Sequence, residues 1–110
     1  MLLSVPPIYH ITTASVWDQA RNIGSYAEST RGLTLAEVGF IHCSYESQVA
    51  QVADAYYQGV PDLVLLVIDP DRLSAELRDE DLGGQGQSFP HIYGPLNVDA
   101  VIAVVPFATP

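Results

Sequence analysis

Three histidines stand in short apolar segments that are spread along this 110-residue chain. They are His10, His42 and His91, and each is followed two positions later by a hydroxyl residue, namely Thr12, Ser44 and Tyr93. Alternate side chains of a strand share a face, so each histidine should lie beside its hydroxyl neighbour. An imidazole donates or accepts hydrogen bonds and changes its protonation near neutral pH, so each histidine is a candidate site residue. We expect the three segments to line one pocket.

Each of these residues also has a structural interpretation, which the sequence leaves open. His10 could be a core histidine that bonds a backbone carbonyl, because buried polar groups are normally paired. Ser44 could serve only as the cap of the helix that follows it. Tyr93 could anchor a rigid turn, since Pro90 and Pro95 enclose it.

Other reaction centres fit the sequence less well. Three histidines can hold zinc, but no two of them have helical ligand spacing and no cysteine pair is present, so we expect no metal. Cys43 follows His42 directly and points to the opposite face of a strand, which argues against an adjacent Cys–His pair. Cys43 is better explained as a small buried hydrophobic residue. No nucleophile-elbow motif supports a serine triad.

The chain is strongly acidic, with 13 Asp and Glu residues, four Arg, no Lys and a formal net charge of −9. Such a field repels phosphate backbones and anionic lipids, which disfavours an extended nucleic acid or a membrane as partner. A single phosphate group could still be held locally, and Arg21 and Arg31 are the candidates. Several acids gather in the segment 76–81, which we interpret as a solvated loop.

Length and composition indicate one domain over residues 1–110. Hydrophobic residues make up 48% of the chain, enough for a core, and its one cysteine excludes an internal disulfide, which suits a reducing cytosol. The segment 1–7 has no basic start and too short an apolar run for a signal peptide. The longest apolar run, 63–68, is too short to cross a bilayer. We therefore expect a cytoplasmic protein.

Strand and helix patterns follow one another without regular alternation. Apolar segments bounded by proline, glycine or polar residues predict strands at 8–12, 40–43, 63–69, 75–78, 91–94 and 100–107. Helical spacing of apolar residues predicts two main helices, at 16–22 and 46–57. The repeated β-α-β units of a doubly wound fold are missing, so we predict an α+β fold. The strand at 63–69 is continuously apolar, and we expect it to be buried on both faces.

Five groups of residues together resemble a small bacterial family known as domain of unknown function 952. They are Ile-Tyr-His-Ile-Thr at 8–12, the set Trp17, Ala20, Gly24 and Tyr26, Gly-Phe-Ile-His-Cys-Ser at 39–44, Leu-Val-Leu-Leu-Val-Ile-Asp at 63–69, and Phe-Pro-His-Ile-Tyr-Gly-Pro-Leu-Asn at 89–97. The resemblance covers nearly the whole chain. It implies the ADP-ribosyltransferase fold, a split mixed β-sheet structure around an NAD cleft, with a distant similarity to RNA 2′-phosphotransferases.

The resemblance also implies roles for single residues. His10 corresponds to the histidine that faces the nucleotide ribose, and His42 corresponds to the histidine of the second motif strand. Phe40 would flank a ring of the ligand, and Tyr56 or Tyr57 would support the cleft. The resemblance supports the fold more than the reaction, because one fold hosts many activities.

The functional expectation is an NAD- or nucleotide-dependent transferase with the three histidines as catalytic residues and NAD as a substrate. The expected binding residues are Thr12, Phe40, Ser44, Tyr93, Arg21 and Arg31. Many of the related transferases carry a catalytic glutamate in their third motif, where this chain offers His91 and Tyr93. That difference favours an alternative, a non-catalytic nucleotide- or metabolite-binding module, and a small regulatory interaction protein is a further one. The sequence leaves open the acceptor, catalysis itself and the oligomeric state.

Overall fold

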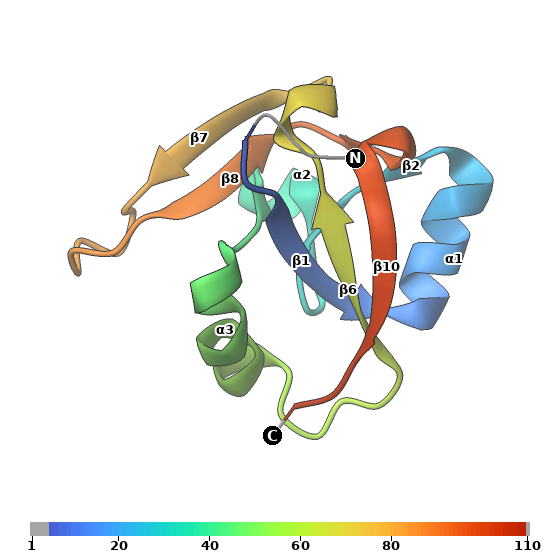
Figure 1. The fold of residues 1–110 in the computed structure, drawn as a ribbon, viewed down its shortest axis with the longest axis horizontal. Coiled ribbons are helices and arrows are strands. Elements are labelled where there is room, and N and C mark those ends of the chain that lie inside the picture. Colours follow the sequence, from blue (N-terminus) through green and yellow to red (C-terminus); the bar gives the residue numbers. More distant parts are fainter. Residues whose placement is uncertain (1–4, 110) are drawn as a thin grey trace.

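A three-stranded antiparallel sheet forms the centre of the fold (Figure 1). Its strands are β1 (Ile8–Thr13), β6 (Leu63–Ile68) and β10 (Val101–Phe107), in the order β1-β6-β10. The computed structural model describes residues 5–109. The first four residues of the segment 1–7, which we read as lacking a signal peptide, therefore lie outside the described residues.

A second antiparallel sheet carries two of the three histidines. Its strands are β5 (Ile41–His42), β8 (Phe89–Tyr93) and β7 (Glu76–Glu80), in the order β5-β8-β7. A bridge between Tyr9 and Ser44 joins β1 to the chain just after β5, through two backbone hydrogen bonds of 2.8 Å. Two short antiparallel pairs complete the strands. They are β2 (Ser25–Tyr26) with β9 (Leu96–Asn97) and β3 (Glu28–Thr30) with β4 (Leu33–Thr34).

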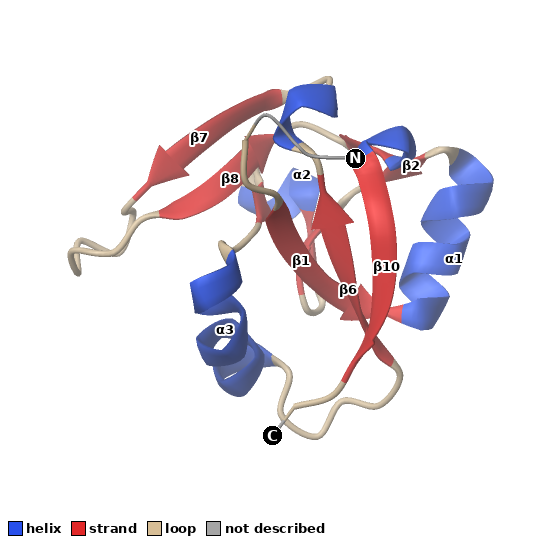
Figure 2. Cartoon of the chain, in the orientation of Figure 1, coloured by secondary structure: helices blue, strands red, loops and turns tan. Residues whose placement is uncertain are grey.

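The two predicted helices are present, one on each side of the central sheet (Figure 2). Helix α1 (Ala14–Ile23) begins at Thr13, whose hydroxyl accepts a hydrogen bond from the Val16 amide at 3.3 Å. Helix α3 (Val49–Tyr56) follows a 3₁₀ turn at Glu46–Gln48. The remaining helical elements are α2 (Leu35–Val38) and 3₁₀ turns at Pro70–Arg72 and Val98–Ala100. Strands and helices are mixed, so the α+β prediction is confirmed.

The core has two parts, one on each face of the central sheet. The larger part packs α1 and the second sheet against Ile8, Leu66 and Ile68. The smaller part packs α3 against Ile11 and Leu63. Cys43 lies in the larger part with no exposed surface, and burial raises the pKa of its thiol. This matches the expected small hydrophobic residue and makes Cys43 a poor nucleophile at neutral pH.

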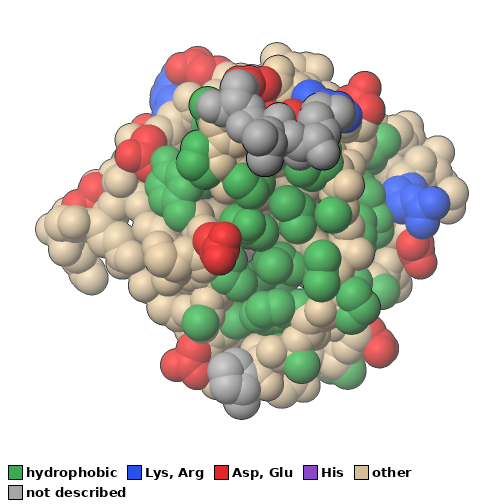
Figure 3. All heavy atoms as spheres, in the orientation of Figure 1, with side chains coloured by type: hydrophobic (Ala, Val, Ile, Leu, Met, Phe, Trp, Pro, Cys, Tyr) green, Lys and Arg blue, Asp and Glu red, His purple; other side chains and the backbone are tan. Residues whose placement is uncertain are grey.

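Two predictions about burial and local structure were wrong. The interpretation of 76–81 as a solvated loop was wrong for residues 76–80, because Glu76–Glu80 pairs with β8 residue by residue and so continues the strand that was predicted at 75–78. Strand β6 is only partly covered, and its neighbour β10 leaves Ile102, Val104 and Val105 each 39–44% exposed. Figure 3 shows hydrophobic side chains gathered over this region of the central sheet. The apolar run therefore reflects sheet pairing more than complete burial on both faces.

We predict that Gly94→Ala destabilises the fold. A Cβ at position 94 would lie 2.8 Å from the Cβ of Ala75, closer than van der Waals contact permits, so one of the two segments must shift. Overpacking of this kind costs about 1–3 kcal/mol, which urea denaturation would measure. Gly83→Ala is the control, because its added Cβ would meet only the Gln85 side chain at 3.9 Å. Equal stabilities of the two variants would contradict the prediction.

Candidate functional site

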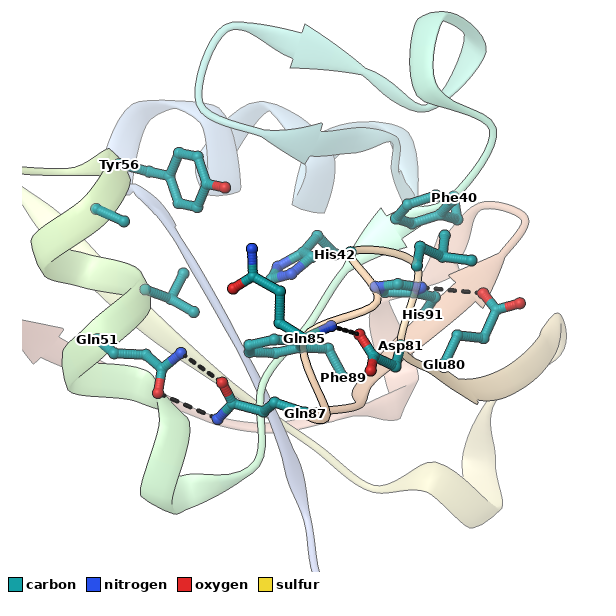
Figure 4. Close-up of a pocket in the computed structure, with 14 residues that line it drawn as sticks. Phe40, His42, Gln51, Tyr56, Glu80, Asp81, Gln85, Gln87, Phe89 and His91 are labelled. Atoms are coloured by element: carbon teal, nitrogen blue, oxygen red, sulfur yellow. Dashed lines mark hydrogen bonds and ion pairs between the residues drawn. The ribbon is translucent and has the colours of Figure 1, made fainter.

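A pocket of about 360 Å³ opens between α3, the second sheet and the segment that joins β7 to β8 (Figure 4). Its walls are Phe40, His42, Gln51, Val52, Ala55, Tyr56, Glu80, Asp81, Leu82, Gly83, Gln85, Gln87, Phe89 and His91. The volume lies within the range of small-molecule sites in proteins. No Lys or Arg is among these residues, whereas two carboxylates and three carboxamides are.

Two of the predicted histidines face each other across the strand pair β5–β8. His42 lies opposite His91 in the register, and their ring centroids are 5.3 Å apart. The neighbouring pair, Ile41 and Ile92, points to the other face and is fully buried in the core. Strand alternation thus puts the apolar pair in the core and the histidine pair in the pocket.

Aromatic rings fix the position of both imidazoles. Phe40 stacks on His91 with 4.0 Å between centroids and 23° between planes. Phe89 lies 5.0 Å from the ring of His42. Phe40 also contacts Tyr93, at 5.5 Å. Phe40 and Phe89 thus give the pocket aromatic walls against which a ligand ring could pack.

Glu80 bonds to two of the predicted site residues. Its Oε1 atom lies 3.0 Å from Nδ1 of His91 and accepts a hydrogen bond from the Tyr93 hydroxyl at 2.5 Å. Both interactions lower the pKa of the Glu80 carboxyl, and the hydrogen bond from Tyr93 has the larger effect. Glu80 is therefore ionised at neutral pH. The guanidinium of Arg78 covers the Tyr93 ring at 4.2 Å from its centroid. Tyr93 therefore supports the site from behind Glu80.

Glu80 was not among the predicted site residues, because we interpreted the acidic segment 76–81 as a solvated loop. Alternation along 76–80 could have indicated that Glu76, Arg78 and Glu80 share a face. The decisive fact was the pairing of β7 with β8, which brings that face to His91 and Tyr93. Phe89 was also not predicted as a wall of the pocket, although it is the first residue of the motif at 89–97.

Burial sets the charge of His42. It lowers the pKa of the imidazole to about 4, and proximity to His91 contributes in the same direction. His42 is therefore neutral at pH 7, with one donor and one acceptor nitrogen. A neutral imidazole beside a carboxylate can bind hydroxyl groups without adding positive charge.

His10 lies behind the pocket and does not line it, in contrast to our expectation of a shared site. It is 2% exposed, its Nδ1 lies 2.7 Å from the carbonyl of His42, and its Nε2 lies 2.7 Å from the Tyr26 hydroxyl. Both ring nitrogens are thus occupied, and burial lowers its pKa to about 4. The reason is its strand: the face of β1 that carries His10 packs into the larger core. The core-histidine interpretation describes this contact.

Thr12 and Ser44, the hydroxyl neighbours of His10 and His42, do not line the pocket either. Thr12 has no exposed surface and Ser44 is 4% exposed. The two predicted arginines are both on the surface. Arg21 pairs with Asp18 on α1 at 3.7 Å, away from the pocket. Arg31 donates to the carbonyl of Tyr56 at 3.4 Å, which places it beside one wall of the pocket.

The segment that joins β7 to β8 closes one side of the pocket. Its start is held by Asp81, whose carboxylate accepts hydrogen bonds from the amides of Gln85 at 3.2 Å and Gly86 at 2.7 Å. Its end is held to α3 by two hydrogen bonds between the side chains of Gln51 and Gln87, at 3.0 and 3.1 Å. Figure 4 shows these amides at the edge of the pocket.

A search of residues 5–109 for metal centres found no group of three His, Cys, Asp or Glu side chains that could hold an ion. Within the same range no helix is long and apolar enough to span a membrane.

The fold and site define an α+β protein with a half-open histidine–glutamate pocket, and comparison with known proteins places it in a family. The chain belongs to the family described as "Protein of unknown function (DUF952)", whose model matches residues 11–104. This confirms the resemblance at the level of the family. A search of curated proteins gave no match.

Solved structures of one bacterial protein have the same fold. The crystal structure of protein CC0527 from Caulobacter crescentus is 32% identical with a TM-score of 0.81, over 93% of this chain and 86% of that one. The crystal structure of a variant of that protein with two methionine substitutions is 31% identical with a TM-score of 0.81, over 93% of this chain and 86% of that one. The solution NMR structure of CC0527 is 32% identical with a TM-score of 0.72, over 91% of this chain and 83% of that one.

We predict that Tyr26→Phe destabilises the protein because it removes the partner of His10 Nε2. Tyr26 is 1% exposed, so no solvent replaces its hydroxyl. Leaving a buried nitrogen unpaired costs about 1–3 kcal/mol, to be measured by urea denaturation. Tyr9→Phe is the matched control, since its hydroxyl makes a longer, 3.4 Å bond to the exposed Glu46. A loss no larger than that of the control would refute the structural role of this pair.

The buried histidines also predict the direction of pH dependence. The pKa values of His10 and His42 fall from 6.5 to about 4 on folding, so between these values the unfolded chain binds more protons than the folded one. The stability that depends on these two neutral histidines is therefore fully present above pH 6.5 and is lost as the pH falls toward 4. Between pH 6.5 and 4 the His42→Gln variant should bind up to one proton fewer on unfolding than the unaltered protein does. Its free energy of unfolding should therefore fall less over this interval. Denaturation curves at several pH values for both proteins would check this, because protonation of the shared carboxylates cancels in the comparison.

Proposed function

We propose that the pocket binds the nicotinamide–ribose part of NAD, or the corresponding part of a related nucleotide, and that the protein is a transferase of the ADP-ribosyltransferase type. The observation that carries this proposal is an ionised Glu80 at the side of an aromatic pocket that holds two histidines. A volume of about 360 Å³ suits a ring and a sugar better than a whole dinucleotide.

The charges of the pocket support a cationic ligand and a cationic transition state. Glu80 and Asp81 are among its walls, and no described lining residue is an Arg or Lys. The nicotinamide ring of NAD carries a positive charge, and a ribosyl group becomes positive as that ring departs. A fixed carboxylate in a partly enclosed site stabilises such charge more than water does.

The walls supply a role for each part of the ligand. Phe40 and Phe89 offer faces for stacking a flat ring. Neutral His42 would orient ribose hydroxyls, because it has both a donor and an acceptor. Arg31, which bonds the Tyr56 carbonyl, is better placed than Arg21 to meet a diphosphate outside the pocket. His10 would act through the backbone of His42 and not on the ligand.

The two packed antiparallel sheets around one pocket also support the relation to the ADP-ribosyltransferase fold that the sequence motifs suggest. Glu80 is our candidate for the catalytic glutamate of that class. Because fold likeness alone does not transfer an activity, the proposal stands on the pocket and not on the sheets.

A non-catalytic nucleotide- or metabolite-binding module is the second candidate. It is favoured by the two hydrogen bonds on Oε1 of Glu80, which engage the carboxylate before any ligand arrives. Binding without turnover would identify the module.

We predict that Phe40→Ala weakens NAD binding by a factor of about 5–150. Aromatic stacking on a base contributes about 1–3 kcal/mol, and 1.4 kcal/mol is about tenfold in affinity. Isothermal titration with NAD and with ADP-ribose would measure it. Ile102→Ala, an exposed apolar truncation on β10 and outside the pocket, is the control. Equal affinities for the two variants, or no binding of NAD to the unaltered protein at millimolar concentration, would remove this site as a nucleotide pocket.

We predict that Glu80→Gln slows nicotinamide release from NAD by about 100-fold or more while the Kd for NAD changes less than about threefold. Removal of one group that stabilises developing charge typically costs a factor of about 10²–10³. Glu76→Gln, on the same face of β7 but outside the pocket, should keep the rate. Tight NAD binding with no nicotinamide release from the unaltered protein would support the binding module instead.

A further inference from the structure

One nitrogen of His91 has no hydrogen-bond partner, although the residue is 3% exposed and belongs to the pocket wall. This atom is Nε2. A buried polar atom without a partner costs about 1–3 kcal/mol, so proteins seldom keep one without a reason. The unpaired nitrogen indicates that a ligand group is meant to meet it.

The other nitrogen decides what kind of group this can be. Nδ1 lies 3.0 Å from Oε1 of Glu80, and an ionised carboxylate only accepts hydrogen bonds. Nδ1 therefore carries the proton. In the neutral ring Nε2 is then a bare lone pair, which accepts a hydrogen bond and can accept a proton.

The surroundings hold this tautomer and this ring orientation. The Tyr93 hydroxyl donates to the same Oε1 and favours the ionised form of Glu80. Phe40 stacks on the imidazole at 4.0 Å and fixes its plane. Figure 4 shows the ring between Glu80 on one side and the interior of the pocket on the other. The arrangement is that of a carboxylate-oriented general base.

Access to Nε2 runs past the segment that joins β7 to β8. Residues 82–87 of this segment are exposed and form one wall of the pocket. Gly84 and Gly86 adopt φ values of 66° and 80°, so the wall contains two points where the backbone turns with little steric cost. The amide pair of Gln51 and Gln87 is a weak closure that a ligand could open.

We propose that His91, oriented by Glu80, is the proton acceptor for a hydroxyl group, so that the second substrate of this site is an alcohol or water. The inference rests on the proposed transferase function and names the acceptor that it requires. In the step, the hydroxyl proton passes to Nε2 and an oxygen electron pair forms a bond to the ribosyl anomeric carbon. The bond from that carbon to the nicotinamide nitrogen breaks, and its electron pair stays on the ring, which leaves as neutral nicotinamide.

A hydroxyl fits the base better than a guanidinium does. An alcohol or water becomes a strong nucleophile only when a base removes its proton in the transition state. A guanidinium keeps its protons at all ordinary pH values and would present a positive charge to Nε2, which can only accept. His91 is therefore the catalytic residue that accepts the proton, and Glu80, besides stabilising the ribosyl charge, positions the His91 ring.

The first test measures the tautomer of His91 directly and needs no turnover. Nitrogen-15 NMR of the ligand-free protein at pH 7.5 should show the His91 proton on Nδ1 and a bare Nε2. Glu80→Ala should lose that preference, whereas Glu76→Ala should keep it. A His91 ring that carries its proton on Nε2, or on both nitrogens, overturns the inference whether or not NAD binds.

The second test measures the acceptor. The protein is incubated with NAD and methanol, or with NAD and a small guanidine, and the products are separated by mass. We expect ADP-ribose and its methyl glycoside as products. In His91→Gln the rate should fall by at least about 100-fold at an unchanged Kd for NAD, since general base catalysis contributes factors of about 10²–10⁴. His91→Ala should regain part of the rate when imidazole is added.

The two tests separate the failure of this inference from the failure of the proposed function. Guanidine products without alcohol products, or a His91→Gln rate within about threefold of the unaltered protein, would overturn the role of His91 while the transferase stands. No nicotinamide release together with the Nδ1 tautomer would overturn the transfer reaction and its hydroxyl step.

Discussion

The pairing of β5 with β8 is the interaction on which the pocket depends. It sets Ile41 against Ile92 on one face and His42 against His91 on the other. The isoleucine pair is fully buried and anchors the second sheet to the core. The histidine pair is thereby held at the pocket wall, 5.3 Å apart. Because side chains alternate along a strand, a shift of β5 by one residue against β8 would turn His42 into the core and Ile41 into the pocket, and would break the histidine pair.

His10 supports this pairing from the central sheet. Both nitrogens of its ring are hydrogen-bonded, Nδ1 with the His42 carbonyl and Nε2 with the Tyr26 hydroxyl. The hydrogen bond to His42 joins β1 to β5 next to the bridge between Tyr9 and Ser44. Residues that look like a catalytic set in the sequence thus divide into two layers. His42 and His91 can meet a ligand, while His10 and Ser44 hold the strands that carry them.

The pocket combines a neutral histidine with an ionised carboxylate, a charge pattern that the net charge of −9 alone does not predict. Burial keeps His42 neutral, and hydrogen bonds from Tyr93 and His91 keep Glu80 ionised. The nearest guanidinium to this cluster, Arg78, is engaged with the Tyr93 ring and with Glu76. A site with this balance suits a ligand head that is neutral or positive. The phosphates of the nucleotide that we propose would lie outside the pocket, which is compatible with a small number of arginines.

Periodicity determined much of this protein from the sequence alone: the α+β class, the main helices, the positions of six strands and the inward direction of Cys43 and Ile41. The short strands β2, β3, β4 and β9 were not predicted. The motifs around the histidines also identified the family, which the comparisons confirm. The role of Glu80 was decided only by the tertiary structure, because the strand predicted at 75–78 stops short of it and only the pairing with β8 extends that strand to residue 80. The depth of His10 was decided in the same way, since both faces of its segment are apolar and only the packing selects which one enters the core. Local pattern fixes which side chains share a face, whereas the assembly of distant strands fixes what that face meets.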